Sequence, residues 1–385
     1  MILEGKVPET GRTVKIVVEE GVVSSVEPIP ERPSRGSRGS CDYISRGFFD
    51  PQVNGFAGVD FNGKDLTPEG LRGAVRSLAL SGVTRFLPTL ITASYDRMAR
   101  QLKILSDALE EDPLFRRMCP GIHLEGPYIS PEDGPRGAHP RQFVRLPEWE
   151  EIEKFQEICR GRIRLITLAP ELDGSIPFIE RAVEKGMVVG IGHTNASEEI
   201  LEDAFRAGAR LSCHLGNGAH AVLPRHRNPI QKQLSMDGLM ASLIVDGIHL
   251  PDYVVKNFVR AKGTGQVLLT TDSMAGAEAP AGRYTLGDLE VEVKPDDHSA
   301  RLLGTSYLAG STLTMDRAVS NVIRFTNVDL PAAIQMVSQN GGKLFPEVGG
   351  EIIAGCPADL VLFEYGEELV VKSTWVHGEK IERSG

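Results

Sequence analysis

The stretch Met187-Val188-Val189-Gly190-Ile191-Gly192-His193-Thr194-Asn195 sets the pattern on which the fold prediction rests. Its apolar, β-branched part, from Met187 to Gly192, predicts a buried strand that stops at a histidine. Soon after it, the segment from Glu198 to Ala207 has the pattern of a helix. A strand that ends on a polar side chain and leads into a helix is the repeating unit of a parallel α/β fold.

The same unit recurs on both sides of this stretch. Further helical patterns are Thr67 to Leu80, Ser94 to Leu109 and Pro147 to Arg160. Seven more strand candidates are Tyr43 to Val53, Thr84 to Leu90, Gly121 to Leu124, Ile163 to Leu168, Arg210 to His214, Ala241 to Val245 and Val267 to Thr271. Eight strands, most of them followed by a helix, predict an α/β fold of the (β/α)8 TIM-type barrel class. The alternative is an open doubly wound sheet, which is disfavoured because no Gly-rich dinucleotide turn occurs early in the chain.

Both ends of the chain have a strand-only pattern instead. Their strand candidates are Thr13 to Glu20, Val22 to Val26, Ala358 to Phe363, Leu369 to Lys372 and Ser373 to Val376. Neither end is long enough to bury a core alone, so we expect the N- and C-terminal segments to form one small β-sandwich. The expected domains are therefore a β-sandwich of residues 1–46 and 350–385 and a barrel of residues 47–349. The Pro-, Arg- and Ser-rich segment 28–40 is expected to be an exposed loop.

Composition excludes several classes of function. The chain has 385 residues, of which 41% are hydrophobic and 24% charged, and this is typical of a soluble globular protein. A formal net charge of −10 without a basic block argues against nucleic acid or an anionic membrane as a partner. No signal-peptide pattern and no uncharged apolar run of the ~18 residues needed for a membrane span occurs. The five cysteines form no Cys-x-x-Cys pair, which indicates reduced thiols, so we expect a cytoplasmic location.

Four of the strand candidates end on side chains that bind metals or transfer protons. In a barrel of this class, functional side chains lie where the strands end, at one face. The third strand ends at Glu125, the fifth at His193, the sixth at His214 and the eighth at Asp272. Two imidazoles and a carboxylate are a common ligand set for a catalytic divalent metal, with a position left open for water. We therefore assign Glu125, His193 and His214 as metal ligands.

Asp272 is the candidate general base. A carboxylate beside a metal-bound water can take its proton and later pass it to a leaving group. Structural roles are the alternative: a single strand-end histidine is more often a hydrogen-bonded structural residue, and Asp272 could cap the next helix, since aspartate is a favoured N-cap. The shared location of the four residues at strand ends favours the catalytic interpretation.

The ordered motifs of the chain resemble the amidohydrolase superfamily and, within it, the N-acetylglucosamine-6-phosphate deacetylases, over nearly the whole length. The motifs that carry the resemblance are Gly47 to Gly55, His123 to Pro127, Gly137 to Pro140, Gly192 to Thr194, His214 to Asn217, Val245 to His249, Thr271 to Ser273, Leu308 to Ser311 and Ala354 to Val361. Each motif alone is a weak signal, whereas the ordered set is a strong one. The resemblance implies metal-dependent hydrolysis of the acetamide of an N-acetyl amino-sugar 6-phosphate, first of all N-acetylglucosamine 6-phosphate, to the free amine and acetate.

The resemblance also bears on the number of metal ions. Many amidohydrolases have His-x-His in the first strand, where it holds a second metal. Here the two positions are Gln52 and Asn54, neutral amides that bind divalent ions poorly. Similarity to members with the same Gln-x-Asn implies one divalent ion. Zinc is the first choice for the ligand types present, with Fe²⁺ or another divalent ion as alternatives.

Roles for further residues are likewise implied by the resemblance. His139 is expected to lie over the N-acetyl group as a second catalytic residue that orients or polarises its carbonyl. The positions that match substrate-binding residues of the family are Ala138, Asn217, Gly218, Arg225 and His249. Some of the phosphate contacts are expected to cross a dimer interface, so a homodimer is implied. A guanidinium fork suits phosphate oxygens, and Arg227 is the alternative to Arg225 in this role.

The loop after His214 leaves the substrate open. Gly216 replaces the bulky residue usual in the family, and residues 219–229 differ from the commonest family version. The alternative substrates are N-acetylgalactosamine 6-phosphate, an unphosphorylated N-acetyl sugar and a cyclic amide. A non-enzymatic alternative is a binding or scaffold protein on a barrel that has lost its chemistry. The presence of all four strand-end residues argues against it.

Overall fold

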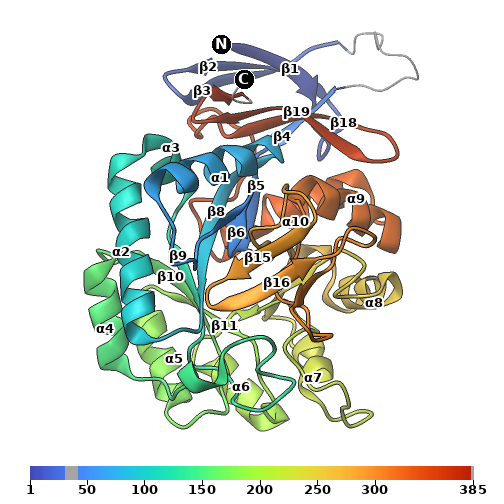
Figure 1. Cartoon of the computed structure of the whole chain (residues 1–385). Coiled ribbons are helices and arrows are strands. Elements are labelled where there is room, and N and C mark those ends of the chain that lie inside the picture. The colour runs from blue at the N-terminus through green and yellow to red at the C-terminus, as the bar shows by residue number, and fades with distance from the viewer. Residues whose placement is uncertain (31–41, 383–385) are drawn as a thin grey trace.

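The computed structural model describes residues 1–30 and 42–382, and a parallel barrel dominates it (Figure 1). Eight parallel strands follow one another in the order β14-β13-β12-β11-β10-β9-β8-β5. Their bounds are β5 (Phe48–Val53), β8 (Val83–Ile91), β9 (Ile122–Glu125), β10 (Ile163–Leu168), β11 (Val188–Ile191), β12 (Leu211–Ser212), β13 (Met240–Ile244) and β14 (Val267–Thr270). The predicted (β/α)8 barrel is therefore confirmed.

The barrel closes between its first and last strands. Val53 at the end of β5 forms a parallel bridge with Ser273, which lies just past β14. The fully buried Asp50 of β5 accepts hydrogen bonds from the Thr270 hydroxyl (2.9 Å) and the Thr271 amide (3.2 Å). Burial raises the pKa of Asp50 to about 6, and the hydrogen bonds from Thr271 and Thr270 counter that effect.

Helices surround the barrel. Their bounds are α1 (Pro68–Leu80), α2 (Tyr95–Glu111), α3 (Pro113–Met118), α4 (Trp149–Ile158), α5 (Ser175–Glu184), α6 (Glu198–Arg206), α7 (Pro229–Ser235), α8 (Asp252–Lys262), α9 (Met315–Thr326) and α10 (Leu330–Val337). Thr67, Ser94 and Ser197 cap α1, α2 and α6, because each side chain accepts a hydrogen bond from a backbone amide of the first turn. No helix among the described residues is both long and apolar enough to cross a bilayer.

Large apolar side chains fill the inside of the barrel at the end where the strands begin. This inner cluster consists of Phe49, Leu87, Leu165, Leu211, Met240, Leu268, Phe345 and Val348. Layers of side chains from several strands are the usual filling of a closed eight-stranded barrel. A cavity can therefore form only at the opposite end of the barrel, where the strands end.

The two chain ends pair into one seven-stranded sheet at the filled end (Figure 1). Its strands, in spatial order, are β20 (Glu379–Ile381), β19 (Leu369–Val376), β18 (Leu360–Tyr365), β4 (Asp42–Arg46), β1 (Ile2–Lys6), β2 (Thr13–Glu19) and β3 (Val22–Pro28). It encloses a small apolar cluster that includes Val14, Ile44 and Trp375, as the expected small domain requires. Val361 and Phe363 of the same sheet join the main core of the barrel. The domain division at residues 46/47 and 349/350 stays a prediction.

Three features differ from the prediction. The candidate Tyr43 to Val53 is two strands, because β4 belongs to the terminal sheet and Gly47 separates it from β5, the first barrel strand. The chain also inserts a three-stranded antiparallel sheet between β14 and α9, formed by β15 (Gly282–Leu286), β16 (Leu289–Val293) and β17 (Ala300–Leu302). A short hairpin, β6 (Gly55–Phe56) and β7 (Val59–Asp60), follows β5. Most of the expected loop 28–40 lies outside the described residues.

Candidate metal centre and active site

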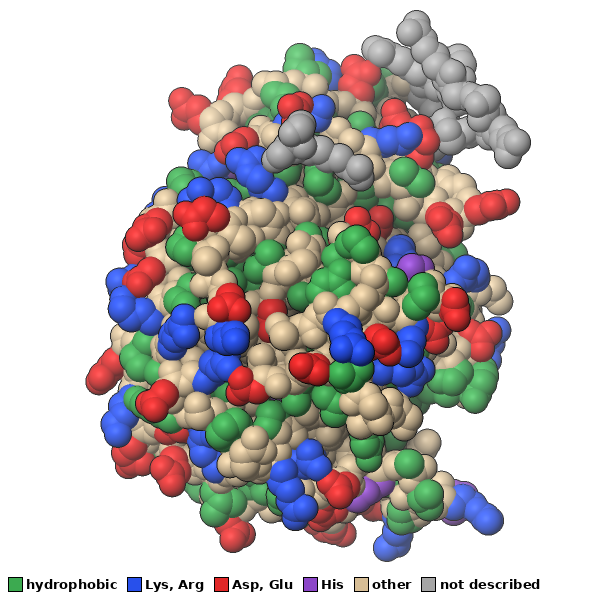
Figure 2. Space-filling model, in the orientation of Figure 1, with side chains coloured by type: hydrophobic (Ala, Val, Ile, Leu, Met, Phe, Trp, Pro, Cys, Tyr) green, Lys and Arg blue, Asp and Glu red, His purple; other side chains and the backbone are tan. Residues whose placement is uncertain are grey.

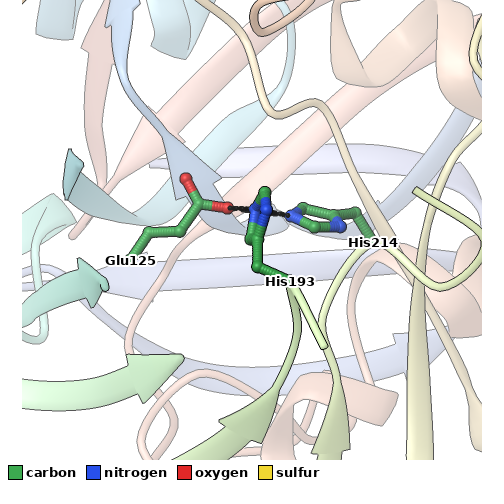
Figure 3. Close-up of side chains that lie close together, drawn as sticks. All are labelled: Glu125, His193 and His214. Carbon is green, nitrogen blue, oxygen red and sulfur yellow. Dashed lines mark hydrogen bonds and ion pairs between the residues drawn. The ribbon is translucent and has the colours of Figure 1, made fainter. Parts of the chain in front are cut away.

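The three predicted ligands meet at the open end of the barrel (Figure 3). Glu125 ends β9, and His193 and His214 follow β11 and β12. The Nε2 atoms of His193 and His214 lie 3.2 and 2.8 Å from Oε1 of Glu125 and 3.1 Å from each other. All three side chains are buried. Two imidazole nitrogens and one carboxylate oxygen, all possible metal ligands, therefore converge on the same point.

The backbone is strained where the chain presents these groups. His193, His214 and Asp272 have φ angles of +51°, +30° and +49°, in the left-handed region that non-glycine residues seldom adopt. Such a conformation costs on the order of 1–3 kcal/mol and persists where the surroundings fix it, most often at functional sites. Each turn directs its side chain over the end of the barrel.

The hydrogen bonds of the cluster fit a divalent cation. Nδ1 of His193 donates to the Pro135 carbonyl at 2.9 Å, so Nε2 carries a lone pair that faces Glu125. Burial opposes ionisation of Glu125, but the neighbouring His193 and His214 imidazoles lower its pKa well below the usual value. A neutral imidazole and an ionised carboxylate are the ligand forms that Zn²⁺ and similar ions require.

Gln52 and Asn54 act as amide donors to the two carboxylates. Nε2 of Gln52 donates to Oε1 of Glu125 (2.7 Å) and to Oδ1 of Asp272 (2.9 Å), and Nδ2 of Asn54 donates to the same Asp272 oxygen (2.7 Å). The Cys213 thiol donates to Oε1 of Gln52 at 3.0 Å, which holds the amide in this orientation. The amide groups of Gln52 and Asn54 therefore direct N–H hydrogens toward the two carboxylates. Histidines at these two positions would instead direct ring nitrogens there and could bind a second ion.

Replacing Gln52 with leucine is expected to lower metal affinity about 10- to 100-fold, the usual effect of losing a partner of a metal ligand. The variant leaves Oε1 of Glu125 without its amide donor. Equilibrium metal titration of the purified variant measures this loss. Cys213→Ser, which keeps a donor to Gln52, serves as the matched control and should bind metal normally; equal affinity of all three proteins would contradict the positioning role.

Asp272 lies across the cluster from the ligands. Burial and then the nearby Glu125 carboxylate raise the pKa of Asp272 to about 7. A cation held by Glu125 and the two histidines would favour the ionised form. The carboxylate is thus placed to exchange a proton with a molecule bound next to the metal position.

His139 lies beside the ligands and His123 beneath them. Nδ1 of His139 is 2.8 Å from the Thr92 hydroxyl, and burial, followed by the neighbouring His193, lowers the pKa of His139 to about 3. A neutral ring whose Nδ1 accepts from Thr92 carries its hydrogen on Nε2, on the side of Glu125. His123 instead bonds to the Pro51 carbonyl (3.1 Å) and to a threonine inside the barrel, so its role is structural.

A cavity of about 650 Å³ opens above the cluster. Its lining includes the ligands, Asp272 and His139, and also the predicted substrate residues Ala138, Asn217, Gly218 and His249. His249 Nδ1 contacts Oδ2 of Asp246 at 2.6 Å, which fixes the ring. At Gly218, with φ +56°, a Cβ atom would lie 2.8 Å from Nδ1 of His193. Only glycine therefore leaves room there for the ligand histidine.

Arg225 is the one predicted site residue that the structure does not bring to this cavity. Arg225 and Arg227 lie on the largely exposed segment 220–228; its first residues, His220 to Val222, line the cavity, but neither arginine does. The segment precedes α7, at the opposite end of the molecule from the terminal sheet (Figure 1). Val222, near its tip, is 89% exposed.

Sequence reasoning missed the cavity wall that the inserted sheet provides. Leu286, Leu289, Arg301 and Tyr307 line the cavity from this insertion. A signal was present: Gly287-Asp288 stands between two alternating segments, Gly282 to Leu286 and Leu289 to Val293, and such a pair is a strong hairpin indicator.

Comparison with known proteins agrees with this geometry. The model of the amidohydrolase family matches residues 43–381 of the chain. The chain belongs to this family. The amidohydrolase is 33% identical to the N-acetylglucosamine-6-phosphate deacetylase of Lysinibacillus sphaericus, over 87% of this chain and 84% of that protein.

Solved structures extend the match. The N-acetylglucosamine-6-phosphate deacetylase of Thermotoga maritima is 32% identical, with a TM-score of 0.87 and 100% of both chains covered. A variant of the Mycobacterium smegmatis enzyme, solved in complex with N-acetyl-D-glucosamine-6-phosphate, gives a TM-score of 0.88 at 26% identity, with 99% of both chains covered. This protein is therefore a hydrolase that acts on amides.

Proposed function

We propose that this amidohydrolase removes the acetyl group from N-acetylglucosamine 6-phosphate, giving glucosamine 6-phosphate and acetate. The observation that carries the proposal is the convergence of Glu125, His193 and His214 beneath a cavity, with Asp272 and His139 beside them. Support comes from the deacetylases that match nearly the whole chain and from the substrate held by one of them.

Glu125, His193 and His214 would hold one divalent cation, with zinc the first choice and Fe²⁺ an alternative. When bound, such an ion acts as a Lewis acid toward water and a carbonyl oxygen. The proposal of a single ion rests on Gln52 and Asn54. Their amide N–H groups donate to the carboxylates of Glu125 and Asp272, so these two side chains do not offer ligand atoms for a second ion.

Asp272 and His139 carry out the proton transfers and the stabilisation of the carbonyl oxygen. Asp272 accepts the proton of the attacking water and returns it to the amide nitrogen as the C–N bond breaks, because an amide anion is a very poor leaving group. Nε2–H of His139 donates to the carbonyl oxygen of the acetamide as negative charge develops there. Ala138 lines the cavity next to His139.

For the phosphate, we propose Asn217, the backbone at Gly218, His249 and Arg225 as contacts. The first three line the cavity, whereas Arg225 is exposed on its own chain. The exposed segment that carries Arg225 and Val222 suits a homodimer in which each subunit contributes Arg225 to the cavity of the other. We further propose a cytoplasmic location, where sugar phosphates occur.

Arg225→Gln is expected to raise KM for N-acetylglucosamine 6-phosphate about tenfold or more with kcat little changed, because a charge-assisted contact to phosphate is lost. Arg227→Gln is the matched control, as it removes an equally exposed arginine two residues away. Steady-state kinetics on both variants decide between the two arginines. A larger effect at Arg227 would reverse the assignment.

Acetate release from a small substrate panel tests the function itself. The panel contains N-acetylglucosamine 6-phosphate, its galacto epimer and the two unphosphorylated sugars. The proposal expects the highest kcat/KM for the first compound. Preference for the epimer or for an unphosphorylated sugar would change the substrate, and absence of acetate from all four would refute the function.

A further inference from the structure

The cavity wall contains a cationic side chain, Arg301, that is not among the predicted substrate-binding residues. Arg301 is the only lysine or arginine among the described residues that line the cavity. The other ionisable lining groups are Glu125, Asp133, Asp272, Tyr307 and histidines. Asp133 is already paired with Arg136, outside the lining. Arg301 therefore supplies the permanent positive charge of a cavity that has two buried carboxylates at its floor.

Hydrogen bonds hold the Arg301 guanidinium in place. Its Nε donates to the Ser299 hydroxyl at 3.0 Å, and its Nη1 donates to the Ser306 carbonyl at 2.9 Å. Among the described residues no carboxylate forms a salt bridge with it. Two neutral acceptors thus orient the group, while the exposed Asp297 carboxylate interacts with it only at longer range, and the remaining N–H groups of the fork are available to an anion.

The sheet that carries Arg301 is anchored to the barrel. Oδ2 of Asp60 accepts hydrogen bonds from the Thr285 hydroxyl (2.9 Å) and the Gly287 amide (2.8 Å) at the β15–β16 turn. Asp288 in this turn also pairs with Arg97 of α2. The apolar face of the insertion packs on side chains of the barrel, and Ala138 of the active-site loop contacts the same cluster.

The wall that bears Arg301 is also linked to the catalytic carboxylate. Arg301 pairs with Leu308 in an antiparallel bridge, and the chain then runs directly to Ser311. The Ser311 amide donates to the Asp272 carbonyl at 2.8 Å. The position of Arg301 is therefore fixed relative to Asp272 through a few backbone hydrogen bonds, which suits a substrate-orienting residue better than a surface charge.

We propose that Arg301 is a substrate-binding residue of this enzyme that contacts an anionic group, the phosphate, of the bound sugar. The inference deepens the proposed function, since it names a specificity-determining cation provided by the chain's own inserted sheet in addition to Arg225. A preorganised guanidinium with no carboxylate partner binds a phosphate oxygen without first breaking a salt bridge.

A binding experiment tests this without relying on catalysis. Glucose 6-phosphate, which has no amide to hydrolyse, is titrated calorimetrically into the metal-loaded wild-type enzyme, Arg301→Gln, Arg301→Lys and Arg283→Gln. Arg283 is the matched control because it is exposed on the same inserted sheet and does not line the cavity. The proposal expects about a tenfold or larger rise in Kd for Arg301→Gln, a smaller rise for Arg301→Lys, and no change for Arg283→Gln.

Kinetics on the same proteins separate binding from chemistry. Arg301→Gln is expected to raise KM for N-acetylglucosamine 6-phosphate by a similar factor with kcat within about twofold of wild type, and to leave kcat/KM for unphosphorylated N-acetylglucosamine unchanged. Equal Kd values for the wild type and Arg301→Gln would overturn the proposal, as would an equal loss on the unphosphorylated sugar. If no variant hydrolyses any panel substrate but glucose 6-phosphate binding still depends on Arg301, the proposed function fails while this inference stands.

Discussion

Asp272→Asn is expected to lower kcat for acetate release by about 10³-fold or more while metal content stays at the wild-type level. Loss of a general acid–base group typically costs 10²–10⁴-fold, and here one carboxylate serves in both proton transfers. Asparagine keeps an oxygen that accepts from the Gln52 and Asn54 amides, which donate to Oδ1 of Asp272 at 2.9 and 2.7 Å. The cluster should therefore keep its shape.

Single-turnover acetate release, together with metal analysis of the same sample, measures this effect. Asp133→Asn provides the control, because Asp133 also lines the cavity but is exposed and paired with Arg136. Turnover of Asp272→Asn within tenfold of wild type would remove Asp272 from the mechanism. Loss of metal together with turnover would instead assign Asp272 to metal binding.

His193→Ala is expected to lower metal affinity more than 100-fold, because loss of a residue that only hydrogen-bonds to a metal ligand already costs about 10- to 100-fold. At one metal ion per chain, the variant should have no activity. The variant removes one of only three ligands in the cluster Glu125, His193 and His214. Competition with a metal-binding dye measures the affinity. His220→Asn is the control, since His220 lines the same cavity but pairs with Glu132 at 2.9 Å, away from the ligands. Equal affinity of the two variants would contradict the ligand assignment.

The sequence predicted the barrel well because its strands are almost entirely buried. A buried parallel strand is a short continuous apolar run, and β10 (Ile163–Leu168) has the predicted bounds. The four groups at the strand ends were found for the same reason, since each stands directly after such a run. Tyr43 to Val53 has the pattern of one strand because both halves are apolar, and only the tertiary pairing of β4 with the terminal sheet divides it.

The remaining parts of the site depend on contacts that adjacent residues do not reveal. Gln52 was recognised as a poor ligand, yet its bridging of Glu125 and Asp272 joins residues 73 and 220 positions apart. Arg301 lies in an insertion whose hairpin turn is visible in the sequence, but its approach to the cavity follows from the docking of that hairpin on Asp60. Arg225 does not line the cavity of its own chain, so the role proposed for it requires a second chain.

Stepwise addition of a single divalent metal to chelator-treated enzyme tests the central claim most directly, with acetate release from N-acetylglucosamine 6-phosphate followed at each step. The account predicts almost no activity without metal and a linear rise that stops at one ion per chain. Full activity in the metal-free enzyme, or a rise that continues to two ions per chain, would contradict a single catalytic cation held by Glu125, His193 and His214.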